Sequence, residues 1–231
     1  MPTNPNHQNA ETEVAKLPEA PEVLFISGID TDAGKTYCTA WLSSELEKQQ
    51  SISVITQKFV QTGCTDMSED IEAHRRLTGK GLLDVDLDHT TAPVIFSYPA
   101  SAQLAARIDG RDIDLSLIDE STDKLKERFD TVLVEGAGGL MVPLTDTFLT
   151  IDYIASRRLP VALVTNGVLG SINHTILSLE ALAARGIKVW AILYNKHFDS
   201  DAVIADDTRN FIGRYAATHF PGVPVIDIPS L

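Results

Sequence analysis

The sequence of 231 residues lacks several features that would assign it to particular protein classes. It has only two cysteines, Cys38 and Cys64, and they do not show the paired spacing of metal-binding or disulfide-rich domains. No apolar run approaches the roughly 18 residues that a membrane-spanning helix needs. The first residues lack the basic start and apolar centre of a secretory signal. These absences predict a cytoplasmic protein with no membrane span and no disulfide framework.

Basic residues are also scarce. There are 19 Lys and Arg against 32 Asp and Glu, which gives a formal net charge of −13. Such a chain repels a phosphate backbone, and we find no local basic patch that would offset the repulsion. The composition therefore predicts no nucleic-acid partner, whereas a small anionic substrate needs only a local basic site.

The chain divides into a short polar segment and one domain. Residues 1–21 are rich in Pro, Asn, Glu and Thr. They cannot bury enough apolar surface to offset chain entropy, so we expect a disordered N-terminal tail there. Residues 22–231 are sufficient for a single α/β domain with a large core.

Short β-branched runs alternate with longer helical patterns, which predicts a doubly wound, mainly parallel sheet covered by helices on both faces. We place strands at residues 22–28, 53–60, 131–135, 160–165, 189–195 and 223–228, with a further candidate at 94–98. We place helices at residues 35–49, 69–78, 101–107, 115–128, 150–157, 172–185 and 201–217. Residues 79–99 show weak periodicity, and we expect mostly loop there.

A glycine-containing stretch, GIDTDAGKT, occupies residues 28–36 between the first predicted strand and the first predicted helix. Backbone amides at such a junction bind phosphates, while Lys35 can reach the β and γ phosphates and the Thr36 hydroxyl can ligate Mg²⁺. Five residues separate Gly28 from Gly34, one more than in the general motif. The sequence predicts a P-loop NTPase-like fold, and the alternative is an ordinary strand-to-helix turn.

A carboxylate ends a predicted buried strand at Glu135 and is followed by Gly136, Ala137, Gly138 and Gly139. A charge at that place is costly without a cation, and open α/β sheets bind ligands at the carboxyl ends of their strands. We therefore predict that Glu135 lies near Mg²⁺. The small residues after it permit a close approach of a phosphate or substrate.

A lysine, Lys58, lies near the end of the second predicted strand. Lysine at a strand end is often only a solvated side chain. If this strand lies beside the first one, however, Lys58 faces the same crevice as the phosphate loop and the phosphoryl group being transferred.

Four motifs resemble those of the dethiobiotin synthetase family: GIDTDAGKT at 28–36, KFVQTG at 58–63, VEGAGG at 134–139 and LGSINH at 169–174. The third is followed by PLTDT at 143–147, also as in that family. The resemblance covers most of residues 22–231. It implies an ATP- and Mg²⁺-dependent ligase of biotin biosynthesis. Its substrates would be 7,8-diaminononanoate and CO2 or bicarbonate. ATP would phosphorylate a carbamate, which then closes to the cyclic urea of dethiobiotin.

The resemblance also implies residue roles by position. The catalytic residues would be Lys58 and Lys35, and the metal ligands Thr36, Asp70 and Glu135; Asp70 is preferred over Asp66 and Glu69 because it matches the family pattern. ATP binding is implied for Asp32, Ala33, Gly34, Lys35, Thr36, Tyr37, Asp70, Glu135, Gly136, Ala137, Gly138, Asn195, Ile228, Pro229 and Ser230. Substrate binding is implied for Thr31, Thr62, Gly170, Ser171, Ile172 and Asn173, the last four across a homodimer interface.

Two departures and two alternatives accompany the resemblance. Phe59 stands where the family commonly has proline, and Thr62 where it commonly has serine. One alternative is a partitioning or septum-positioning ATPase switch of the ParA or MinD type, but its characteristic early lysine would fall at Asp30. The other is an amide-forming, ATP-dependent synthetase, which usually carries a glutaminase domain for which this length has no room.

Overall fold

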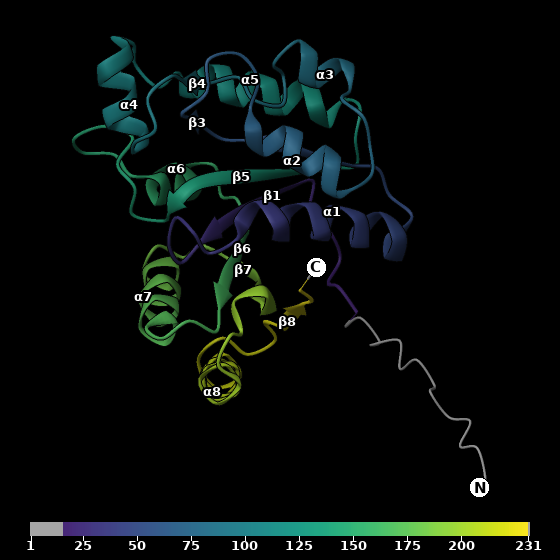
Figure 1. Ribbon diagram of the computed structural model, residues 1–231, viewed down its shortest axis with the longest axis vertical. Helices are drawn as coiled ribbons and strands as arrows, with labels where there is room; N and C mark the ends of the chain where they lie inside the picture. Colours follow the sequence, from purple (N-terminus) through teal and green to yellow (C-terminus); the bar gives the residue numbers. More distant parts are fainter. Residues whose placement is uncertain (1–15, 231) are drawn as a thin grey trace, which may run out of the picture.

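A six-stranded parallel sheet is the centre of the computed structural model, which describes residues 16–230 (Figure 1). Its strands, in spatial order, are β2 (Val54–Lys58), β5 (Thr131–Gly139), β1 (Val23–Gly28), β6 (Val161–Asn166), β7 (Val189–Asn195) and β8 (Val225–Ile228). A separate parallel pair is formed by β3 (Gln61–Thr62) and β4 (Ile95–Phe96). All neighbouring strands of the main sheet run parallel, as a doubly wound fold requires.

Helices connect the strands. They are α1 (Lys35–Gln50), α2 (Glu69–Leu77), α3 (Asp84–Leu87), α4 (Ala102–Asp109), α5 (Leu115–Lys126), α6 (Thr150–Ser156), α7 (Ser171–Ala184) and α8 (Ala202–His219), with a short 3₁₀ turn η1 (Lys196–Phe198). None of the helices within residues 16–230 has the length and apolar character needed to cross a bilayer.

Each face of the sheet is buried in its own hydrophobic core. In β6, Val161 and Leu163 belong to one core, while Ala162 and Val164 belong to the other. Because side chains alternate along a strand, a strand that is apolar throughout must be covered on both sides. Helix α1 covers one face, and α5, α6, α7 and α8 contribute to the core on the other. The predicted doubly wound fold is confirmed.

The predicted elements are found close to their expected places, and the differences are local. Strand β5 continues to Gly139, beyond the predicted end at residue 135, because Gly139 still pairs with Gly28 of β1 across an irregularity. The predicted strand at 94–98 is only the two-residue β4, which lies outside the main sheet. Three elements were not predicted, namely α3, β3 and η1, and each is four residues or shorter.

The order of the strands corrects one expectation. Strand β2 does not lie beside β1, because β5 lies between them and pairs with both. The register of β2 and β5 nevertheless sets Lys58 directly beside Glu135. Lys58 therefore lies at the crevice because β2 pairs with β5, and not because β2 pairs with β1.

Residues 16–21 contact the domain, although the sequence placed them in the tail. Residues 1–15 of that predicted tail lie outside the described residues. Leu17 is buried, its amide donates to Oε1 of Gln49 at 3.0 Å, and Nε1 of Trp190 donates to the carbonyl of Glu19 at 2.9 Å. The average composition of the segment concealed the buried Leu17 and the backbone groups beside it.

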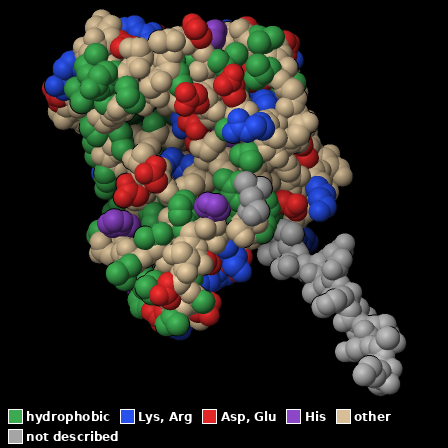
Figure 2. Space-filling view, in the orientation of Figure 1, with side chains coloured by type: hydrophobic (Ala, Val, Ile, Leu, Met, Phe, Trp, Pro, Cys, Tyr) green, Lys and Arg blue, Asp and Glu red, His purple; other side chains and the backbone are tan. Residues whose placement is uncertain are grey.

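Charged side chains of both signs are interspersed on the face of the molecule shown in Figure 2. Hydrophobic side chains gather there near α4, where Leu104 and Ile108 are exposed. On this face the acidic excess is therefore spread out and does not form one large patch.

A buried ion pair anchors α2 to the sheet. Arg75 donates from Nε and Nη2 to Asp86, both at 2.8 Å, and from Nη1 to Thr56 on β2, also at 2.8 Å. Thr91 donates a further bond to Asp86 at 2.7 Å. Burial would raise the pKa of Asp86, but the hydrogen bonds from Arg75 and its other donors lower it below its usual value. The pair thus ties α2 and α3 to β2.

We predict that Arg75→Met lowers the free energy of unfolding by about 3 kcal/mol, because it leaves the Asp86 carboxylate buried and without its cation. The matched control is Arg128→Met, which removes an exposed pair with Asp84 at 3.0 Å and should change stability little. Urea denaturation followed by circular dichroism measures both. Equal losses in the two variants would contradict the anchoring role of Arg75.

Candidate active site

A cavity of about 430 Å³ opens at the carboxyl ends of β1, β2 and β5. It is lined by Thr31, Asp32, Gly34, Lys35, Thr36, Lys58, Val60, Gln61, Thr62, Asp70, Glu135, Ala137, Gly138 and Phe198. Most of these residues were predicted site residues. The parallel order of the sheet brings together side chains that are more than a hundred residues apart in the sequence.

The loop from β1 to α1 is built to bind an anion. Gly34 has φ of 86° and begins α1 without any side-chain cap, so the first amides of the helix are available to a ligand. Nζ of Lys35 donates to the carbonyls of Asp30 and Thr31 at 3.0 and 2.8 Å, so the lysine lies folded over the loop. Burial and the nearby Lys58 ammonium lower the pKa of Lys35 to about 8.

Four side chains from four elements form a polar cluster at the floor of the cavity. Oγ1 of Thr36 lies 2.7 Å from Oδ1 of Asp70 and 3.2 Å from Oε1 of Glu135. Nζ of Lys58 lies 2.5 Å from Oδ2 of Asp70 and 2.8 Å from Oε1 of Glu135. The cluster therefore holds two carboxylates around one hydroxyl and one ammonium.

The Glu135 carboxylate is fully buried. Burial alone would raise its pKa, but the Lys58 ammonium, together with His74, holds the pKa well below its usual range. Burial likewise opposes the charge of Lys58, while Glu135 and Asp70 raise its pKa above the usual value. Both groups are thus charged at neutral pH, and each one stabilises the charge of the other.

The donor set of this cluster fits Mg²⁺. Thr36, Asp70 and Glu135 offer one hydroxyl and two carboxylates, which are the hard oxygen ligands that Mg²⁺ prefers. Within residues 16–230 no three His, Cys, Asp or Glu side chains are grouped so that they could hold a metal alone. A bound Mg²⁺ would therefore complete its coordination with phosphate oxygens and water, as is usual for this ion.

Asp70 differs from the nearby acids Asp66 and Glu69 in its burial and its contacts. Asp66 and Glu69 are exposed, whereas Asp70 is partly buried and contacts Thr36 and Lys58. Asp70 lies in the first turn of α2, and the Ser68 side chain caps this helix by accepting from the amide of Ile71 at 3.2 Å. Geometry thus supports the choice of Asp70 that the family pattern implied.

Phe59 does not disturb Lys58. Its ring packs against Phe25 and Tyr153 in the core, with centroids 5.5 and 4.8 Å apart. Its amide donates to the carbonyl of Glu135 at 2.9 Å. The aromatic side chain therefore lies on the opposite side of the strand from Lys58 and fixes the same backbone.

Several predicted residues lie near the cavity without lining it. Asn195 ends β7 beside Ile228 of β8, and its Nδ2 donates to the carbonyl of Ala33 at 3.4 Å. The remaining residues absent from the cavity lining are Tyr37, Gly136, Pro229, Ser230 and the helix start at Gly170, Ser171, Ile172 and Asn173. Within a single chain, the predicted substrate residues of α7 are therefore not part of the cavity.

Four residues at the site were not predicted: His74, Val60, Gln61 and Phe198. Nε2 of His74 lies 2.7 Å from Oε2 of Glu135. His74 follows Asp70 by four residues, so helical spacing would have placed both side chains on one face of α2. Phe198 belongs to the short turn η1, and no periodic pattern in the sequence indicated its position.

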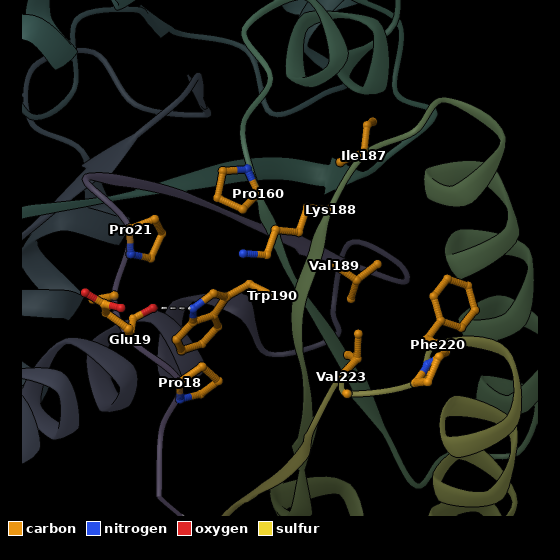
Figure 3. Close-up of a pocket in the computed structure, with 13 residues that line it drawn as sticks. Pro18, Glu19, Pro21, Pro160, Ile187, Lys188, Val189, Trp190, Phe220 and Val223 are labelled. Atoms are coloured by element: carbon orange, nitrogen blue, oxygen red, sulfur yellow. Dashed lines mark hydrogen bonds between the residues drawn. The ribbon is translucent and has the colours of Figure 1, made fainter.

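A second cavity, of about 770 Å³, lies at the opposite edge of the sheet (Figure 3). Pro21, Pro160 and Val223 line it, and all three precede strands. Only Glu19 and Lys188 among its lining residues carry charge. This edge therefore lacks the grouped acids and bases of the carboxyl edge, and the smaller cavity is the candidate active site.

Comparisons with known proteins find relatives that match most of the chain. The AAA domain family matches residues 22–227. The ATP-dependent dethiobiotin synthetase BioD 2 of Pasteurella multocida is 44% identical over 212 residues, which cover 91% of this chain and 99% of that protein. The ATP-dependent dethiobiotin synthetase BioD of Chlorobaculum tepidum is 49% identical over 208 residues, covering 90% of this chain and 87% of that protein.

Solved structures show the same fold at low identity. A ParA family ATPase from Chlorobium tepidum TLS superposes with a TM-score of 0.51 at 15% identity, covering 92% of this chain and 85% of that one. The pNOB8 ParA protein gives 0.50 at 14% identity, covering 89% and 74%. Identities this low show a common architecture and nothing about activity.

We predict that Gly34→Ala lowers ADP affinity at least about tenfold, because the left-handed backbone disfavours alanine and the added Cβ would collide with Nδ2 of Asn195. Gly222→Ala is the matched control, since Gly222 has φ of 88° but no atom within 4 Å of an added Cβ. It should lose about 1 kcal/mol of stability and keep its ADP affinity. Isothermal titration calorimetry and denaturation measure both, and wild-type ADP binding by Gly34→Ala would refute the close packing of the loop.

Proposed function

The chain belongs to the ATP-dependent dethiobiotin synthetases, and we propose that the cavity at the carboxyl edge of its sheet binds ATP, Mg²⁺ and 7,8-diaminononanoate. The enzyme is an ATP-dependent ligase of biotin biosynthesis. One observation carries the assignment of the site. Lys58, Thr36, Asp70 and Glu135 converge within hydrogen-bonding distance beside an anion-binding loop.

The phosphates of ATP occupy the loop in this proposal. The free amides at the start of α1 bind them, and Lys35 exchanges the carbonyls of Asp30 and Thr31 for the phosphate oxygens. The base lies toward Asn195, whose side chain is held beside Ala33 by a hydrogen bond and accepts from the amide of His197 at 3.1 Å. This arrangement orients the γ-phosphate toward Lys58.

The residues that would hold Mg²⁺ are Thr36, Asp70 and Glu135. When bound, the ion neutralises charge on the phosphate oxygens. Lys58 neutralises the two carboxylates in the structure described here. The loaded site therefore needs Lys58 to turn from these acids toward the incoming anions.

The proposed reaction begins when an amine of diaminononanoate adds to CO2, forms a C–N bond and loses a proton, which gives a carbamate. A carbamate oxygen then attacks the γ-phosphorus, and the bond to ADP breaks. The second amine attacks the carbonyl carbon of this mixed anhydride and loses a proton, the C–O bond to phosphate breaks, and the cyclic urea is closed. Negative charge develops on carbamate and phosphate oxygens during these steps, so the Lys58 and Lys35 ammonium groups lower the barrier by stabilising that charge.

The two threonines Thr31 and Thr62 are placed to bind the reacting end of diaminononanoate. Thr31 is exposed and Thr62 partly buried, and both line the cavity together with Lys58. Their hydroxyls can donate to carbamate oxygens and accept from amines. Thr62 keeps the hydroxyl of the serine common in the family, so we propose that the contact is retained.

The partitioning-ATPase alternative shares only the architecture of this protein. Its members are found among the structural neighbours at 14–15% identity, whereas the dethiobiotin synthetases reach 44–49%. The fold is therefore common to both groups and does not distinguish them. The synthetase assignment rests on the sequence identity, and the polar cluster of Thr36, Lys58, Asp70 and Glu135 is consistent with it.

We also propose that the enzyme is a homodimer located in the cytoplasm. Diaminononanoate is long, and the residues assigned to its distal carboxylate, at the start of α7, do not line the cavity of their own chain. Leu169 precedes this helix and Leu177 lies on it, and they are 82% and 61% exposed. A second subunit would cover such an apolar surface and supply helix amides to the carboxylate.

The proposed cytoplasmic location agrees with the state of the cysteines. Cys38 and Cys64 are free thiols, which suits a reducing compartment.

We predict that Lys58→Ala lowers the rate of dethiobiotin formation about 100- to 1000-fold, because it removes a preorganised charge from the reacting centre. Formation from diaminononanoate, bicarbonate, Mg²⁺ and ATP is followed by mass spectrometry. Lys80→Ala is the control, since Lys80 lies on the surface and pairs with Glu47. A near-normal rate in Lys58→Ala would refute its catalytic role.

The shared site predicts complementation between subunits. Lys58→Ala and Gly170→Trp are each expected to be nearly inactive alone. In the mixed dimer, one of the two composite sites carries both intact residues, so mixed subunits should recover about a quarter of wild-type activity. Sedimentation and subunit exchange are measured alongside, and a monomer, or no recovery after confirmed exchange, would contradict the shared site.

A further inference from the structure

We propose that His74 is a positioning residue for the metal site, because it holds one carboxylate oxygen of Glu135 and leaves the other to face Thr36 and Lys58. This inference rests on the proposed role of Glu135 as a ligand of Mg²⁺. His74 itself does not line the cavity. It acts through Glu135.

The two oxygens of Glu135 have different partners. Nε2 of His74 lies 2.7 Å from Oε2, while Oε1 lies 2.8 Å from Nζ of Lys58 and 3.2 Å from Oγ1 of Thr36. A carboxylate only accepts hydrogen bonds, so Nε2 of His74 carries the hydrogen and donates it. Donation to Oε2 therefore directs Oε1 alone toward the cavity.

One helix supplies both a predicted metal ligand and this positioning group. Asp70 and His74 are four residues apart on α2, so they project from the same face. Ser68 fixes the start of the helix, and Arg75 fixes the adjacent turn to Thr56 and Asp86. The distance between Asp70 and the bonded Glu135 is thus set by one rigid element.

The second ring nitrogen of His74, Nδ1, makes no hydrogen bond that would explain why a histidine is buried here, so the contact with Glu135 is the only polar interaction of the ring among residues 16–230. His74 is completely buried, and its Nδ1 has no hydrogen-bond partner among residues 16–230. A buried polar atom without a partner costs about 1–3 kcal/mol. An apolar side chain would fill the same space without this cost, but it would leave Oε2 of Glu135 without a donor.

Fixing one oxygen defines how Glu135 can meet a cation. The terminal torsion of a glutamate is broad, so an unrestrained carboxylate rotates easily. With Oε2 bonded to His74, the carboxylate presents a single oxygen in a fixed direction. Hydrogen bonds of this kind, which orient a ligand from behind, are typically worth 10- to 100-fold in metal affinity.

The test uses full-length His74→Phe and His74→Gln. Phenylalanine keeps the ring and removes the donor, whereas the glutamine amide restores an N–H at similar reach. ADP binding is measured by calorimetry with EDTA and across a Mg²⁺ titration. The Mg²⁺ concentration for half-maximal dethiobiotin formation is measured in parallel. For His74→Phe we expect about a 10- to 100-fold increase in the Mg²⁺ requirement. We expect unchanged ADP affinity in EDTA, and recovery of most of the loss in His74→Gln.

Three outcomes overturn the inference: a wild-type Mg²⁺ requirement in His74→Phe, equal losses of ADP affinity with and without Mg²⁺, or no recovery in His74→Gln. If His74→Phe does not fold, His74→Asn replaces it, because the shorter amide is polar but does not reach Glu135. Glu135→Gln separates this inference from the proposed function. An unchanged Mg²⁺ requirement in Glu135→Gln removes the metal assignment itself, whereas a changed requirement there with none in His74→Phe refutes only the role of His74.

Discussion

The fully buried carboxylate of Glu135 is the constraint on which the site depends. A buried charge is stable only when cations and hydrogen-bond donors surround it. Lys58 supplies the cation from β2, and His74 supplies a donor from α2. The register of β2 against β5 and the position of α2 on the sheet must therefore both be correct before Glu135 can be accommodated. The chain therefore cannot fold stably in this region without also assembling the site.

The same constraint explains the balance of charge in the cavity. Asp70 and Glu135 attract Lys58. The pKa of Lys35 is lowered mainly by burial and, to a smaller extent, by the Lys58 ammonium. In the proposed function, phosphate anions that bind between the two ammonium groups would make this proximity favourable. The protein can thus keep a net charge of −13 and still place two lysines, Lys35 and Lys58, at the proposed phosphate site.

Sequence patterns predicted this site unevenly, and the reason is the range over which each pattern acts. The loop before α1 and the strand that carries Glu135 depend on local chemistry, so both were predicted near their places in the chain, although β5 continues to Gly139. Strand order depends on contacts between distant segments, so the insertion of β5 between β1 and β2 could not be derived. His74 lay within reach of helical spacing but was overlooked because a buried histidine on its own indicates no ligand. Phe198 belongs to a turn with no periodicity.

Phe59 shows how a departure from a family pattern can leave the chemistry intact. Successive side chains of a strand point to opposite faces of the sheet, so the side chain after Lys58 must point away from the crevice. There it meets Phe25 and Tyr153, and its volume fills the core. Its amide also donates to Glu135, a bond that proline could not make. The aromatic residue therefore strengthens the link between β2 and β5 at the point where Lys58 must meet the buried carboxylate.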